Sequence, residues 1–196
     1  MSVSLYDSAL LEKIKSWTNK TSIHVYGTDE TASVFGILAD ETNDKPLRLP
    51  IITLSHNGSA YDISVPNKQP LSYDGATLDA SFEKSLQLNA IPISIEYQLD
   101  VYTRYYKEAD EIIRNLIFNL INFPKVTVEI PYNDQKILHD SAISLAETVI
   151  DNSDISLRLI KGQFTRLSLN FTLNDAYIWD VRVRDNYQLL VTTEFE

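Results

Sequence analysis

The sequence predicts an α+β fold: a single domain with a mixed, mostly antiparallel β-sheet, in which one principal α-helix and an N-terminal helix pack on one face. Three observations predict this class. Apolar residues alternate over 91–101, they recur at helical spacing over 107–123, and the last third of the chain is extended by pattern. Neither a linker nor an internal repeat is visible, so we expect one domain over residues 1–196.

The N-terminal third predicts one helix and two short strands. Residues 8–18 carry an apolar stripe typical of an amphipathic helix, and Asp7 or Ser8 can cap its start. Residues 22–26 predict a short strand that ends in a turn at 27–29. Residues 31–38 suit a helical turn or a strand equally. Residues 47–54 predict a strand, which Pro50 should confine to a sheet edge.

The segment from 43 to 86 has no clear periodicity. Asn57-Gly58 is the strongest turn signal in the sequence, and residues 64–85 contain two prolines and a glycine. We therefore expect a projecting loop or hairpin in this segment.

The central elements are the clearest. The alternation over 91–101 predicts a long central strand with one buried face. The helix over 107–123 opens with acidic residues, which its dipole favours, and Pro124 stops it before a strand at 125–130. Further strands are predicted at 142–150, 156–160, 165–173, 177–183 and 189–195.

Composition excludes several classes of function. The chain has 17 basic and 27 acidic residues, a net charge of −10, so broad nucleic-acid binding is disfavoured. It has no cysteine, which excludes disulfides, thiolate metal sites and cysteine nucleophiles. The N-terminus does not resemble a signal peptide, and no apolar run of about 18 residues occurs. We expect a protein that is neither secreted nor membrane-spanning.

A catalytic centre is not predicted. The tripeptide His139-Asp140-Ser141 contains the residue types of a hydrolytic triad, but neighbouring side chains point apart. We interpret His24 as a surface residue and His56 as part of a solvated turn. The acidic residues Glu108, Asp110, Glu111, Asp151 and Asp154 are interpreted as helix-start and turn charges. We predict no catalytic residue, no cofactor, no metal site and no enzyme.

Aromatic residues gather where a surface is expected. Tyrosine, tryptophan and arginine dominate the energetic centres of protein interfaces. The alternative is that these rings close the core or cover its rim. The predicted partner-binding residues are Tyr102, Arg104, Tyr105, Tyr106, Trp179, Leu189, Val191 and Phe195.

Residues 91–124, IPISIEYQLDVYTRYYKEADEIIRNLIFNLINFP, resemble the strand-then-helix core of tail-terminator, or tail-completion, proteins of tailed bacteriophages. Residues 49–54, 151–154 and 175–177, with Gly162 and Arg166, resemble elements of the contractile-tail branch. The resemblance implies a non-catalytic protein that forms a six-fold ring, caps the tail tube and sheath, and joins them to the neck.

The resemblance also implies partners and a location. The partners would be further copies of the chain, the tail tube protein, the tail sheath protein and the neck or head-completion proteins. DNA would only pass through the lumen of the ring, and no membrane would be involved. The protein would reside in the virion, and in the host cytoplasm during assembly.

Two alternatives remain at this point. Another neck, tube or baseplate adaptor of the phage tail would share the strand-plus-helix core. A ligand- or carbohydrate-binding module would use its tyrosine and tryptophan rings as a binding platform.

Overall fold

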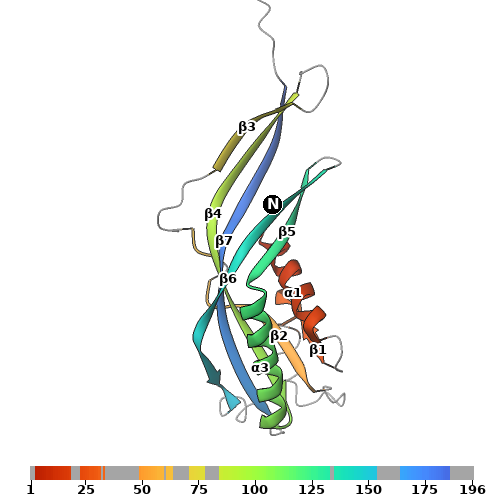
Figure 1. Cartoon of the computed structure of the whole chain (residues 1–196), viewed down its shortest axis with the longest axis vertical. Coiled ribbons are helices and arrows are strands. Elements are labelled where there is room, and N and C mark those ends of the chain that lie inside the picture. The colour runs from red at the N-terminus through yellow and green to blue at the C-terminus, as the bar shows by residue number, and fades with distance from the viewer. Residues whose placement is uncertain are drawn as a thin grey trace, which may run out of the picture.

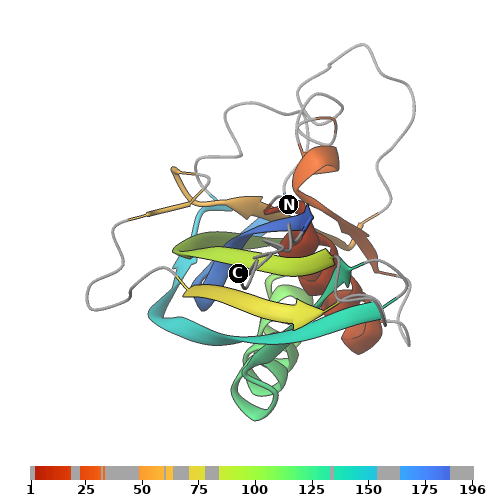
Figure 2. The ribbon, with the colours of Figure 1, turned by 90° about the horizontal axis from the view of Figure 1, so that it is seen from above.

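A curled sheet of seven strands carries two long helices on one face (Figures 1 and 2). The computed structural model describes residues 3–18, 23–31, 33, 49–59, 61–63, 71–77, 84–132, 135–153 and 164–185. The elements are α1 (Ser4–Thr18), β1 (His24–Tyr26), β2 (Ile51–His56), β3 (Leu71–Thr77), β4 (Lys84–Thr103), α3 (Tyr106–Asn122), β5 (Lys125–Tyr132), β6 (Gln135–Asp151) and β7 (Thr165–Asp185). The predicted α+β class is confirmed.

The sheet is built around one long strand pair. Its order is β1-β2-β4-β7-β6-β5, and β3 pairs with the remaining part of β4. Only β1 and β2 run parallel; the other described pairs are antiparallel. Strand β4 pairs with β7 from Lys84↔Asp185 to Thr103↔Thr165. This pair therefore runs the whole length of the sheet.

Apolar periodicity explains both the strand and the helices. Along β4 the odd-numbered residues Ile93, Ile95, Tyr97, Leu99 and Val101 are buried in the main core. Helix α3 adds a stripe of Ala109, Ile113, Leu116 and Leu120 at helical spacing, and α1 adds Tyr6, Leu10 and Ile14. Burial of these stripes holds both helices on the same face of the sheet.

The predicted edge position of Pro50 is wrong. Strand β2 begins at Ile51 and lies between β1 and β4. Pro50 precedes the ladder, so its missing N–H removes no hydrogen bond from the sheet. Its carbonyl instead accepts a hydrogen bond of 3.2 Å from the backbone N–H of His24.

The two strands predicted at 165–173 and 177–183 are one strand. Strand β7 is continuous, and a bulge marks the boundary between the predicted segments. Ile93 pairs with Ala176 and Ile95 pairs with Leu173, so β7 carries one extra residue at this point. Asp175 takes the unusual φ of 60°. The bulge at Asp175 therefore does not end the strand.

The structure describes the remaining sequence expectations only in part. Within 43–86, residues 71–77 form β3 and pair with β4. A helical turn covers 28–31, at the start of the ambiguous segment 31–38. The strands predicted at 156–160 and 189–195 lie outside the described residues. Among the described helices, none is long and apolar enough to cross a membrane.

Candidate assembly surface

Three strands project as an arm beyond the helices. The arm consists of β3, residues 84–90 of β4 and residues 179–185 of β7, and it extends past the ends of α1 and α3 (Figure 1). β6 follows β7 only as far as the pair Ala142↔Asn174 and then continues beside β5. The described sheet therefore forks at the bulge, with the arm on one side and the β5–β6 hairpin on the other.

The described base of the arm is covered by the rest of the molecule. Directly paired residues share a face of a sheet, and successive residues alternate between faces. Ala90 of β4 pairs with Trp179 of β7, and the two residues are 1% and 6% exposed. Both pack with Ile130 of β5, so this face of the arm meets the β5–β6 hairpin.

A polar anchor fixes the base of the arm to α1. The Tyr6 hydroxyl donates to the carbonyl of Tyr177 at 3.1 Å and accepts from its N–H at 2.8 Å. The Trp179 indole N–H donates to the same hydroxyl at 3.3 Å. Burial raises the pKa of Tyr6 above its ordinary value. One hydroxyl thus holds the edge of β7 where the arm begins.

Trp179 is buried at this anchor rather than offered to a partner. Its side chain is 6% exposed and packs with Ala90 and Ile130. The prediction of Trp179 as a surface contact residue is therefore wrong, because its large apolar ring closes the base of the arm.

His139 binds the bulge and forms no triad. Its Nε2 lies 2.6 Å from the carbonyl oxygen of Asp175, and the Ser141 hydroxyl donates to the same oxygen at 3.1 Å. Asp140 accepts a hydrogen bond of 2.6 Å from Thr127. His139 and Ser141 therefore reach the same oxygen, whereas the Asp140 carboxylate pairs with Thr127 instead. His139 and Ser141 instead secure the strained residue at which the sheet forks.

Large apolar residues are exposed at the C-terminal end of α3. Phe118, Ile121 and Phe123, together called the α3 patch, are 60%, 59% and 56% exposed. Phe118 and Ile121 are three residues apart, so they lie on the same side of the helix, and Phe123 follows as its C-cap. Single exposed apolar residues are common on protein surfaces, but three large ones within six positions favour a partner.

The turn between β4 and α3 carries the other predicted contact residues. Arg104, Tyr105 and Tyr106 are exposed there, with both rings more than half accessible. Tyr102 is only 1% exposed, so its prediction as a contact residue is wrong. Its ring packs on Phe164 and lies under the Arg166 guanidinium at 5.6 Å. Leu189, Val191 and Phe195 lie outside the described residues.

A buried ion pair lies near Tyr102. Arg166 donates to the Asp100 carboxylate at 2.9 Å, and Ser168 and Gln98 donate to the same carboxylate. Burial lowers the pKa of Arg166, but the hydrogen bond and charge of Asp100 outweigh this and raise it overall. Because the Asp100 carboxylate is buried and accepts all these hydrogen bonds, we assign it a structural role.

His56 is a structural residue rather than part of a solvated turn. It ends β2, and its Nε2 lies 3.0 Å from the Asp7 carboxylate. The Tyr97 hydroxyl donates to Asp7 at 2.7 Å, and the Thr28 hydroxyl donates to it at 3.1 Å. Asp7 therefore does not cap a helix start at residue 8, because α1 begins earlier, at Ser4. His24 is exposed, as predicted.

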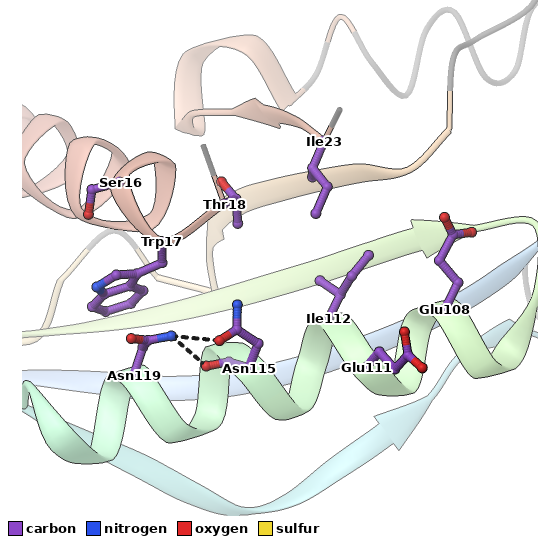
Figure 3. A pocket seen from close by; sticks show the side chains of 9 residues that line it. All are labelled: Ser16, Trp17, Thr18, Ile23, Glu108, Glu111, Ile112, Asn115 and Asn119. Carbon is purple, nitrogen blue, oxygen red and sulfur yellow. Dashed lines mark hydrogen bonds between the residues drawn. The ribbon is translucent and has the colours of Figure 1, made fainter. Parts of the chain in front are cut away.

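A cavity of about 560 Å³ lies between the end of α1 and α3 (Figure 3). Trp17 and Ile23 face Ile112 across it, with the Asn119 amide donating to Asn115 along the helix. Its lining residues are Ser16, Trp17, Thr18, Ile23, Glu108, Glu111, Ile112, Asn115 and Asn119. Glu108 lies in the first turn of α3, where the helix dipole favours it, and Glu111 lies in the next turn. The lining offers hydroxyl, amide and carboxylate groups to a hydrogen-bonding ligand, and none of the lining residues is a histidine.

The acidic residues near 151 form a turn. Asp151 accepts hydrogen bonds from the Ser153 hydroxyl and N–H, which lower its pKa. Asp154 lies outside the described residues. Within the described part of the chain, no three His, Asp or Glu side chains are grouped as metal ligands.

The sequence matches no known protein-family model and no curated protein. The arm, the α3 patch and the exposed turn at 104–106 are therefore interpreted from this chain alone.

Deleting Asp175 tests the bulge in β7. Removal of the extra residue shifts β7 by one position. The shift separates Trp179 from Tyr6 and turns the Trp179 side chain to the other face of the sheet. We expect a loss of at least about 3 kcal/mol of unfolding free energy, comparable with truncating a buried aromatic. Urea denaturation measures this, and tryptophan fluorescence should shift to longer wavelength.

The matched control for that deletion is Asp175→Gly. It keeps the bulge and accepts a positive φ, so stability should stay within about 1 kcal/mol of the native chain. If the deletion is tolerated as well as this substitution, the bulge does not set the orientation of the arm.

Alkaline pH should destabilise the protein through its buried tyrosines. Burial, followed by the nearby Asp7 carboxylate, raises the pKa of Tyr97 above its ordinary value, and burial followed by Asp100 does the same for Tyr102. Above about pH 10 the unfolded chain loses these protons while the folded chain keeps them, so stability falls as pH rises. The slope is about 1.4 kcal/mol per pH unit for each such tyrosine.

The measurement compares urea denaturation of the native chain and Tyr97→Phe across this pH range. The variant should lose one tyrosine's share of the slope, although it is less stable at neutral pH. Equal slopes in the two proteins would contradict a protonated Tyr97 in the folded state.

Proposed function

We propose that the chain is a virion assembly protein of the tail-terminator type. Copies form a ring, with six members as the expected number, that caps the tail tube and sheath and joins them to the neck. The protein acts through its surfaces and transforms no substrate. It resides in the virion, and in the host cytoplasm during assembly.

The observation that carries this proposal is the set of large apolar side chains exposed at the C-terminal end of α3. Phe118, Ile121 and Phe123 are each more than half exposed, and apolar surface favours burial against a partner. Such a surface suits a protein that meets copies of itself or neighbouring components. Antiparallel strand edges add a second means of contact, since their free backbone groups pair with other strands.

The arrangement of β4 and α3 also supports the proposal. The segment that resembles tail-terminator proteins spans a strand that ends at Thr103 and a helix that starts at Tyr106. The connection between them presents Arg104, Tyr105 and Tyr106 at the surface. Tyrosine and arginine at an exposed turn are suited to a partner contact.

The acidic charge fits a ring around DNA. A lumen lined by acidic residues would repel the phosphate backbone and let DNA pass without binding. The carbohydrate-binding alternative is less favoured, because Trp179 and Tyr102 are buried and leave fewer rings for a platform.

Assembly is tested with purified protein and with isolated tail tubes. Light scattering should give the mass of a closed oligomer, and electron microscopy should locate the protein at the head-proximal end of the tubes. Tyr105→Ala and Arg104→Ala should each weaken assembly by about 1–2 kcal/mol if they are energetic centres.

Lys107→Ala is the matched control, because Lys107 is exposed beside the same turn and is not aromatic. It should leave assembly unchanged. If both test variants assemble like the control, the turn is not part of the interface. A protein that remains monomeric at high concentration and binds no tail tube would overturn the proposed function.

A further inference from the structure

The cavity between α1 and α3 is a groove along the side of α3 that faces the end of α1 (Figure 3). Its volume of about 560 Å³ falls within the range of ligand sites. Glu108 lies at one end of the groove, and Trp17 lies beside Asn119 at the other. Glu108 and Asn119 are eleven positions apart on the helix, which corresponds to about 16 Å. The groove is therefore long enough for an extended segment of chain.

The end of the groove near the start of α3 attracts a cation. Glu108 and Glu111 are three positions apart, so their carboxylates are neighbours on the helix surface and repel each other. Within the described part of the chain, neither carboxylate forms an ion pair. Asp110 differs from both, because Arg114 pairs with it. A basic group between the two glutamates would replace their repulsion with charge-assisted hydrogen bonds.

The other end of the groove suits an apolar side chain. The Lys13 ammonium lies 5.5 Å from the centre of the Trp17 ring and donates to the carbonyl of Lys125. This ammonium already lies against the ring, so a second cation there would be repelled. Ile23 and Ile112 face each other in the middle of the groove and are only partly buried. Charge is therefore recognised at one end, and apolar surface is available over the rest.

The charge of the chain indicates what fills the groove. The net charge is −10, so a second copy would approach the acidic end against repulsion, whereas a basic segment of a different protein would be attracted. Glu111 and Asn119 are eight positions apart, about 12 Å along the helix. In an extended segment, side chains four residues apart point the same way and are separated by about 13 Å. The two distances match.

We infer that the groove binds an extended segment of a partner protein, in which a basic and an apolar side chain are four residues apart. The basic group lies between Glu108 and Glu111, and the apolar side chain packs on Trp17. The residue midway between them points the same way and packs over Ile23 and Ile112. The contact goes beyond the proposed function, because it defines the chemistry of a different partner and does not depend on ring formation.

Peptide binding to the whole chain tests the contact. The probe is the acetylated peptide amide Arg-Ser-Val-Ser-Leu, and the comparison peptide has Glu in place of Arg. The chain has two tryptophans, and Trp179 is buried, so a fluorescence change on binding reports on Trp17. The test variant combines Glu108→Gln with Glu111→Gln. Asp110→Asn is the matched control, because it removes a carboxylate of the same helix that does not line the groove. Circular dichroism checks that each variant is folded.

The arginine peptide should bind saturably to the native chain, by fluorescence and by calorimetry. The double variant should bind it about tenfold more weakly, because hydrogen bonds to a charged group are lost, and the control should bind it like the native chain. Arginine amide alone should also bind about tenfold more weakly, because it lacks the apolar half. Equal binding of the two peptides, equal binding by the double variant and the control, or no saturable binding at millimolar peptide would overturn the contact. Each of these results leaves ring assembly, measured separately by light scattering, unaffected.

Discussion

The pairing of β4 with β7 is the constraint on which the rest of the structure depends. It runs from one end of the sheet to the other, and each remaining strand joins it directly or through one neighbour. A single extra residue in β7, beside Asp175, shifts the register of the pair near the point where the arm begins. On one side of this bulge the buried residues of both strands meet α1 and α3 in the main core. On the other side Ala90 and Trp179 pack with Ile130 of β5.

Polar side chains hold this bulge in place. Tyr6 binds both backbone groups of Tyr177, and His139 and Ser141 bind the carbonyl of Asp175. These contacts satisfy backbone groups where the regular ladder between β6 and β7 ends. They also tie the first helix to the base of the arm. An arm fixed at its base has less conformational entropy to lose when it binds, which favours assembly.

Sequence reasoning predicted the elements with a sustained period and missed those set by tertiary context. The alternation over 91–101 and the helical spacing over 107–123 predicted β4 and α3, because each period persisted over several turns or pairs. Pro50 was misjudged because its position just before a ladder does not show in the sequence. Tyr102 and Trp179 were taken as surface residues because ring type does not reveal burial. The arm left one readable signal: apolar residues stand at 86, 88 and 90 and then at 91, 93 and 95, a change of phase within one strand.

Hydrogen–deuterium exchange of dilute and assembled protein tests the proposed assembly surface most directly. The account predicts slower exchange, on assembly, at the backbone amides of residues 104–106 and 118–123, because both segments become covered by a neighbouring copy. An assembled protein in which these segments exchange as fast as in the monomer, while amides elsewhere become protected, would contradict it.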